Sequence, residues 1–273
     1  MILRWLMAPF RVVSILFLLI SLVLVLITLY LTVSSESKRK HAMQSSKAYI
    51  CRLLLCCINI RVRRIGAANE EARLWVANHI SWLDVLMFTD RAKTHFIAKS
   101  EVRHWPVVGL VTRLLDTVFI NRHNKFLVYR SLPRAQHVIK QRETLFVFPE
   151  GTTGHGNKTS RIYPMMFELA VREKCWVQPI AIRYWNHNNQ PSEAAPFVND
   201  DGIIGNIFKL ALQRFTLAEV HYLTPLDGSS MTRKEMAAAT QRAIDGVLKQ
   251  PHPSSHPSSQ PGTSAAVLKT LIH

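Results

Sequence analysis

Acidic residues and cysteines are both scarce in this chain of 273 residues. Asp and Glu together number 18 against 34 Lys and Arg, so the formal net charge is +16 at pH 7. A surplus of that size favours anionic partners, which leaves nucleic acids and anionic lipid surfaces as candidates. The cysteines show neither zinc-finger spacing nor the density of a secreted disulfide scaffold. We interpret Cys51, Cys56, Cys57 and Cys175 as apolar packing residues in a reducing compartment.

Two further signatures are missing. The chain has no G-x-S-x-G elbow, and Cys175 lies in no recognisable motif, which argues against a serine or cysteine hydrolase. It also has no helix-turn-helix, RNA-binding or zinc-finger signature, so we expect no nucleic-acid partner. A membrane-tethered nucleic-acid-binding protein, suggested by the net charge and by the basic segment Arg61–Arg64, stays as an alternative of a different class.

One long apolar run is present near the start of the chain. No charged residue occurs from Val12 to Val33, and about 20 apolar residues suffice for a helix to cross a bilayer. The run exceeds the apolar region of about 7–15 residues in a signal peptide, and no A-x-A-like site follows it before Lys40. We therefore predict an uncleaved, single-pass transmembrane helix. The heavier basic flank follows the helix, which places the body of the protein on the cytoplasmic side.

A second apolar segment, Ala48–Ile60, is too short to span a bilayer and carries Arg52. It fits a helix lying at the membrane interface and, equally, an ordinary core helix. We assign residues 1–60 to a membrane anchor, with the transmembrane helix over 12–33 and the interfacial helix over 48–60. We expect residues 61–249 to form the main domain, and residues 250–273 to be a disordered Pro/Ser-rich tail.

Beyond Arg61 short β-rich runs alternate with helical stretches. This alternation predicts an α/β fold with a largely parallel, mixed sheet flanked by helices. The predicted strands are Ile60–Ile65, Leu74–Ala77, Thr94–Ala98, Thr117–Asn121, Thr144–Phe148, Trp176–Arg183 and Ala218–Leu223. The predicted helices are Ser81–Thr89, Pro106–Leu115, Lys125–Lys140, Tyr163–Glu173, Ile203–Phe215 and Arg233–Lys249.

Asn78, His79 and Asp84 follow the predicted strand Leu74–Ala77. Ligands of α/β sheets collect at the carboxyl ends of strands. A neutral imidazole held by a nearby carboxylate is a suitable general base. However, Ser81 and Asp84 also match the capping pattern that begins many helices, and the two interpretations are compatible.

A second group, Pro149 to Thr153, follows the apolar strand Thr144–Phe148. Glycine and threonine at the end of a strand can bring backbone N–H groups close to an anionic head group. Taken alone, this group also fits an ordinary turn.

In this order, the motifs resemble those of the glycerolipid acyltransferase family, typified by the 1-acylglycerol-3-phosphate acyltransferases. The resemblance covers roughly Val76–Ile182. N-H-x-x-x-x-D is matched by Asn78, His79 and Asp84, and P-E-G-T by Pro149, Glu150, Gly151 and Thr152. Between them, K-x-E and P-x-x-G are matched by Lys99, Glu101, Pro106 and Gly109, and F-x-x-R by Phe119 and Arg122. Val177, Pro179 and Ile180 resemble the closing motif.

The resemblance implies transfer of a fatty acyl group from acyl-CoA or acyl carrier protein to the hydroxyl of a lysophospholipid, most simply 1-acyl-sn-glycerol-3-phosphate. It makes His79 and Asp84 catalytic. It assigns substrate binding to Arg122, Glu150, Gly151, Thr152, Thr153, Phe119 and Lys99. No metal ion or other cofactor is implied, and the partners are the lipid acceptor, the acyl donor and membrane lipids, as at a bacterial inner membrane. We expect backbone N–H groups near Gly151 or after His79 to bind the oxyanion.

Three departures bear on the acceptor. Asp116 replaces the glycine that begins the F-x-x-R motif, Thr153 stands where an arginine often follows E-G-T, and Met165-Met166 replaces a frequent Phe-Lys. Guanidinium groups bind phosphate in a forked, charge-assisted way, so a missing arginine weakens the case for a phosphate-bearing acceptor. Arg122 alone could still bind a phosphate. The sequence Glu150–Gly154, E-G-T-T-G, also resembles that of acyltransferases acting on other lyso-lipids, which makes lyso-ornithine lipid an alternative acceptor.

Overall fold

The structure is a computed structural model, and it describes residues 2–89, 94–99, 117–120, 125–198 and 202–252. The elements follow in the order α1 (Ile2–Thr32), α2 (Glu36–Cys57), β1 (Ile60–Ile65), β2 (Leu74–Ala77), α3 (Leu83–Leu86), β3 (Thr94–Lys99), β4 (Val118–Ile120), α5 (Lys125–Lys140), β5 (Thr144–Val147), the 3-10 helix η2 (Pro164–Phe167), α6 (Glu168–Glu173), β6 (Trp176–Asn186), α7 (Ile203–Ala211), β7 (Thr216–Tyr222), β8 (Leu226–Asp227) and α8 (Arg233–Leu248). The predicted helix Pro106–Leu115 and residues 253–273 of the predicted tail lie outside the described residues.

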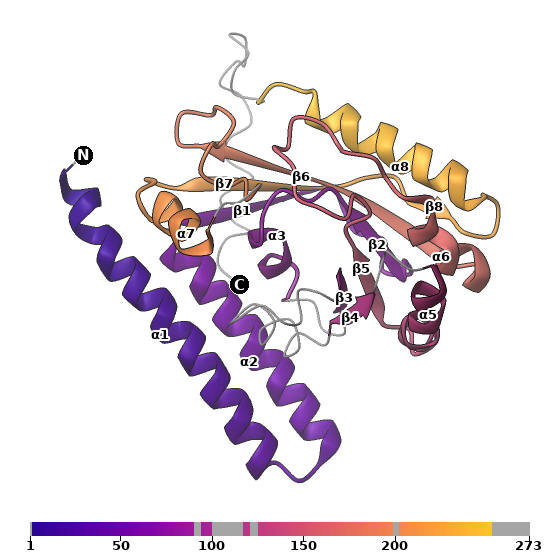
Figure 1. The fold of residues 1–273 in the computed structure, drawn as a ribbon, viewed down its shortest axis with the longest axis horizontal. Coiled ribbons are helices and arrows are strands. Elements are labelled where there is room, and N and C mark those ends of the chain that lie inside the picture. The colour runs from indigo at the N-terminus through magenta and orange to yellow at the C-terminus, as the bar shows by residue number, and fades with distance from the viewer. Residues whose placement is uncertain (1, 90–93, 100–116, 121–124, 199–201, 253–273) are drawn as a thin grey trace.

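The strands form one mixed sheet in the order β1-β7-β6-β2-β5-β3-β4, with β8 pairing on β6 (Figure 1). β6 pairs antiparallel with β7 and β8, and the remaining pairs are parallel. This confirms the predicted fold class. Because β2 and β5 are parallel neighbours, the loops that follow them meet at the same edge of the sheet.

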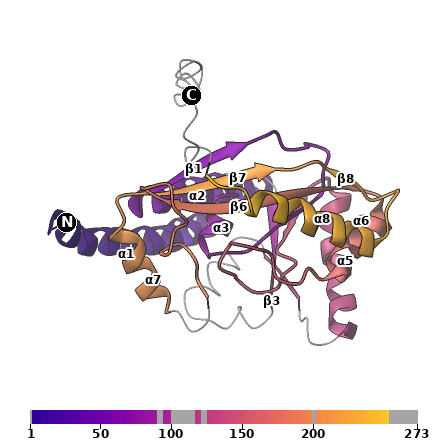
Figure 2. The ribbon, with the colours of Figure 1, turned by 90° about the horizontal axis from the view of Figure 1, so that it is seen from above.

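β2 shows why the sheet is covered on both faces. All four of its residues are buried, as expected for a central parallel strand. Trp75 and Ala77 belong to the apolar cluster that includes α1, α2 and α3, whereas Leu74 and Val76 belong to the cluster that includes α5, α6 and α8. Figure 2 shows α8 lying along the sheet beside β6.

α1 and α2 pack side by side as a helical hairpin (Figure 1). The predicted interfacial helix is the second half of a longer helix that begins at Glu36 and ends at Cys57, and Ile60 already belongs to β1. Its Ile50 and Leu54 lie in the same apolar cluster as Leu22 of α1. This face of α2 therefore fits the core-helix interpretation.

α1 contains a segment, Pro9–Thr32, that is long and apolar enough to cross a membrane. Many of its large apolar side chains are exposed: Phe10, Val13, Leu16, Phe17, Ile20, Leu24, Val25, Ile27, Tyr30 and Leu31. Arg11 hydrogen-bonds the carbonyls of Ala211 and Gln213, which fixes the first part of α1 to the end of α7. An uncovered apolar face of this size is suited to lipid.

Candidate active site

The site begins where β2 ends. Asn78 is buried, and its side-chain amide donates to the Ile182 carbonyl at 3.0 Å while its side-chain oxygen accepts from the Ile182 N–H at 2.7 Å. This pair of bonds continues the β2–β6 pairing for one more residue. His79 therefore leaves the sheet from a fixed point.

His79 and Asp84 lie in direct contact. The Nδ1 atom of His79 is 2.8 Å from Oδ2 of Asp84, whose side chain is fully buried, while the His79 side chain is 20% exposed. The same Oδ2 accepts from the backbone N–H groups of Ile80 at 2.7 Å and Ser81 at 3.0 Å. Since an ionised carboxylate only accepts, Nδ1 carries the proton and Nε2 is the basic nitrogen of the neutral ring.

Helix α3 is shorter than predicted and begins within the loop that Asp84 holds. The sequence predicted a helix over Ser81–Thr89, but only Leu83–Leu86 is α-helical. Asp84 uses its carboxylate on the N–H groups of the preceding loop, and beyond α3 the chain continues in turns. Only half of the predicted capping pattern forms, because the N–H of Ser81 donates to Asp84 while the buried Ser81 hydroxyl has no partner in the described part of the chain and α3 has no side-chain cap. Asp84 therefore serves mainly to hold His79 and the loop before α3.

The His79 ring is also held by Phe148. The two rings are stacked, with centroids 4.0 Å apart and an interplanar angle of 15°. Phe148 is buried and directly precedes the Pro149–Thr152 motif. The imidazole is therefore fixed in plane by Asp84 and on one face by an aromatic side chain, which leaves its Nε2 edge for a reacting group.

Glu150 joins the two motif loops. Its Oε1 accepts from the backbone N–H of His79 at 2.9 Å, and its Oε2 accepts from the backbone N–H of Ser160 at 2.5 Å. Burial raises the pKa of Glu150, and the two N–H donors partly oppose that rise. In the opposite direction, the N–H of Gly154 donates to the His79 carbonyl at 2.8 Å. Both oxygens of this carboxylate, which the family resemblance assigns to substrate binding, have backbone donors.

The Gly151 turn has a left-handed backbone, with φ of 76°. The N–H of Gly151 donates to the Phe148 carbonyl at 3.2 Å, and the N–H groups of Ile80 and Ser81 are bound to Asp84. These candidate oxyanion donors are therefore already occupied. Within the described part of the chain, the backbone N–H groups of Thr152 and Thr153 have no acceptor.

The remaining residues assigned to substrate binding differ in how they are placed. The Thr153 hydroxyl donates to the Phe197 carbonyl, and the N–H of Phe197 donates to the Ile80 carbonyl at 2.9 Å, so this segment also ties the two loops together. The backbones of Lys99 and Phe119 lie on the neighbouring strands β3 and β4. Arg122 lies outside the described residues.

Tyr184 is a member of the site that the sequence did not indicate. Its hydroxyl donates to Oδ1 of Asp84 at 2.6 Å. No short motif links the two residues, which are 100 positions apart, and only the pairing of β6 with β2 brings them together.

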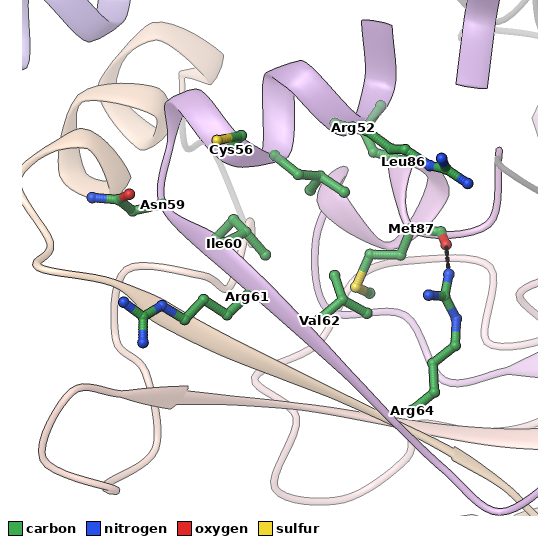
Figure 3. Close-up of a pocket in the computed structure, with 10 residues that line it drawn as sticks. Arg52, Cys56, Asn59, Ile60, Arg61, Val62, Arg64, Leu86 and Met87 are labelled. Atoms are coloured by element: carbon green, nitrogen blue, oxygen red, sulfur yellow. Dashed lines mark hydrogen bonds between the residues drawn. The ribbon is translucent and has the colours of Figure 1, made fainter. Parts of the chain in front are cut away.

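A separate pocket of about 340 Å³ lies between α2, β1 and α3 (Figure 3). Apolar side chains and the arginines Arg52, Arg61 and Arg64 line it. Arg64 donates to the Met87 carbonyl at 2.9 Å. Neither His79 nor Asp84 lines this pocket.

Comparison with known proteins matches residues 59–183 to the acyltransferase family model. Lyso-ornithine lipid O-acyltransferase of Pseudomonas aeruginosa is 31% identical over 193 residues, which cover 70% of this chain and 73% of that protein. The 1-acyl-sn-glycerol-3-phosphate acyltransferase of Neisseria gonorrhoeae is 25% identical, over 70% of this chain and 75% of that protein. The crystal structure of the 1-acyl-sn-glycerophosphate acyltransferase PlsC from Thermotoga maritima aligns with a TM-score of 0.65 at 19% identity, over 94% of this chain and 98% of that chain.

Proposed function

Because this chain belongs to the glycerolipid acyltransferase family, we propose that it is an enzyme that transfers a fatty acyl group from a thioester to the free hydroxyl of a lyso-lipid, with His79 as general base. The observation that carries this proposal is the 2.8 Å contact between His79 Nδ1 and the buried carboxylate of Asp84. It leaves Nε2 of a fixed, neutral imidazole as the proton acceptor.

In the proposed reaction, Nε2 of His79 removes the proton of the acceptor hydroxyl as its oxygen attacks the thioester carbonyl carbon. Asp84 stabilises the imidazolium that forms. The tetrahedral intermediate collapses with cleavage of the C–S bond, the new ester is released, and the imidazolium returns its proton to the leaving thiolate. We assign the oxyanion to the N–H groups of Thr152 and Thr153.

Two acceptors fit. Lysophosphatidic acid is the acceptor that the motif resemblance implies, and the Neisseria relative carries the corresponding name. Lyso-ornithine lipid is favoured by the identity with the Pseudomonas relative. It is also favoured by Thr153, which stands where the family often has an arginine and whose hydroxyl donates to the Phe197 carbonyl. Acyl-CoA and acyl carrier protein are both candidate donors.

We also propose that the outward apolar face of α1 holds the protein to the membrane, with the catalytic domain on the cytoplasmic side. The hairpin constrains this attachment. Arg11 fixes the first part of α1 to the catalytic domain, and α2 returns along α1 to β1. The single-pass arrangement expected from the sequence thus requires α1 to separate from α2.

The test incubates membranes carrying the protein with labelled acyl-CoA or acyl carrier protein and a panel of lyso-lipids, and identifies the product by mass. We expect one lyso-lipid to be acylated by the wild type and none by His79→Ala. His137→Ala, which changes an exposed histidine of α5, is the matched control and should retain activity. Full activity in His79→Ala would refute the assigned base, and absence of transfer to every lyso-lipid would refute the reaction.

A further inference from the structure

The buried carboxylate of Asp84 is satisfied from two sides. Oδ2 accepts from His79, Ile80 and Ser81, all within the motif loop, whereas Oδ1 accepts from the Tyr184 hydroxyl at 2.6 Å. Asp84 is 0% exposed, so no solvent can replace a missing donor. An ionised group in such a place is stable only when each of its oxygens is hydrogen-bonded.

We propose, on the basis of the function proposed above, that Tyr184 is a positioning residue that holds the Asp84 carboxylate in the orientation that His79 requires for proton transfer. The hydroxyl fixes rotation of the carboxylate from the side opposite the imidazole. The side chain acts through Asp84 and does not touch the substrate.

Strand β6 holds both ends of the motif that runs from Asn78 to Asp84. Ile182 and Tyr184 are separated by two positions and face the same side of the strand. Ile182 binds Asn78 through its backbone, and Tyr184 binds Asp84 through its side chain. The first and last residues of the motif are therefore held by one rigid strand, and His79 lies between them.

Tyr184 keeps its proton in this setting. Burial raises its pKa well above the ordinary value, and the adjacent charge of Asp84 and the hydrogen bond to it act in the same direction. The hydroxyl is thus a constant donor. The other titratable groups that face this point are His79 on the motif loop and Glu150, which binds the His79 N–H.

The first test is Tyr184→Phe, which removes one oxygen and preserves the ring. We expect kcat to fall about tenfold to a hundredfold, with both KM values changed by less than about twofold, because alignment is lost and binding is not. Without the hydrogen bond from Tyr184, the Asp84 carboxylate keeps more of its negative charge, and this charge stabilises the protonated form of His79 relative to the neutral form. The acid limb of the kcat/KM profile should therefore move to higher pH.

Trp185→Phe is the matched control. Trp185 is the next residue of β6 and faces the other side of the sheet. The substitution removes a buried hydrogen bond of similar length, 2.8 Å, from the Trp185 ring N–H to Glu219. It should lower the melting temperature without moving the pH profile. A folded Tyr184→Phe variant with wild-type kcat and wild-type pH profile would overturn the proposal.

Two measurements keep the proposal testable if Tyr184→Phe folds poorly. Replacement of Tyr184 by a ring-fluorinated tyrosine retains the packing and strengthens the donor, so the acid limb should move to lower pH. In the Asp84→Asn background, Tyr184→Phe should change kcat by less than about twofold, because the group through which it acts is gone. An unchanged acid limb with the fluorinated residue, or equal effects of Tyr184→Phe in both backgrounds, would contradict the proposal.

A readout without turnover separates this proposal from the proposed function. The proton between His79 Nδ1 and Asp84 should give a low-field NMR resonance in the purified protein, and Tyr184→Phe should shift it. If no lyso-lipid is acylated but the resonance shifts, the reaction is wrong and the coupling stands. If acylation occurs and the resonance is unchanged, Tyr184 does not act on the dyad.

Discussion

Glu150 Oε1 accepts a hydrogen bond from the backbone N–H of His79 at 2.9 Å, although the two residues are 71 positions apart. With the bond from the Gly154 N–H to the His79 carbonyl, it fixes both backbone polar groups of His79. The two motifs are therefore one structural unit, and the second motif positions the residue of the first that we propose as the base.

Glu150→Gln should lower kcat about tenfold and leave the acceptor KM unchanged. The carboxylate accepts from two backbone N–H groups at once, whereas an amide has one oxygen and would place its own NH₂ against the other donor. Steady-state kinetics over a range of acceptor concentrations checks this expectation.

Glu193→Gln, at an exposed carboxylate, is the control for loss of one negative charge and should have no effect. A rise in the acceptor KM of Glu150→Gln with unchanged kcat would instead mean that Glu150 contacts the acceptor directly.

The raised pKa of Glu150 predicts a pH dependence of stability. A carboxyl with a folded-state pKa above its usual 4.5 binds its proton more tightly when folded, so it stabilises the folded state at low pH. That contribution is lost as the pH rises from 4.5 through the raised value. The melting temperature of the wild type relative to Glu150→Gln should therefore fall across this window, and a difference that rises with pH would contradict the sign.

The regular parts of the fold were predictable because their patterns are local. The helix Lys125–Lys140 and the strands Ile60–Ile65 and Leu74–Ala77 have the predicted bounds. The motif loops were found at the carboxyl ends of β2 and β5 because strand-to-loop transitions are visible in the sequence. The extent of α2 was missed because its first half is polar, and its helical state is stabilised by packing on α1.

The role of Tyr184 could not be predicted, because its contact with Asp84 depends on the tertiary structure. The predicted strand ended at the charged residue Arg183, one position before Tyr184. In the structure Arg183 donates to the buried Glu219 of β7 at 2.8 Å, so β6 continues to Asn186. A residue that acts across a sheet is revealed only by the order of the strands.

Arg122→Ala should raise the acceptor KM about tenfold or more, with less effect on kcat, if the acceptor bears a phosphate. A guanidinium that binds the phosphate equally in the ground and transition states contributes uniform binding. Comparing lysophosphatidic acid with lyso-ornithine lipid, whose head group is an amino acid, makes the measurement specific. An unchanged KM for the phosphate-bearing acceptor would remove Arg122 from the phosphate site.

Phe17→Glu combined with Ile20→Glu should release much of the protein from membranes, because both side chains lie on the exposed apolar face of α1. Membrane flotation measures the bound fraction. Arg242→Ala combined with Lys249→Ala, two exposed residues in α8 and at its end, lowers the net charge by the same amount and should leave the protein bound. Equal release by both pairs would mean that charge, and not the α1 face, holds the protein.

Asn78→Ala should lower both stability and activity, because it leaves the buried N–H and carbonyl of Ile182 without partners. Each of the two orphaned groups costs about 1–3 kcal/mol, together about 2–6 kcal/mol, so the melting temperature should fall by about 4–24 °C. Thr232→Ala, which removes the capping box of α8, should cost about 1 kcal/mol and leave kcat unchanged. The contrast separates a general loss of stability from loss of the fixed point at which His79 leaves the sheet. If Asn78→Ala lowered the melting temperature as expected but retained wild-type kcat, the anchoring of the motif to β6 would be unnecessary for catalysis.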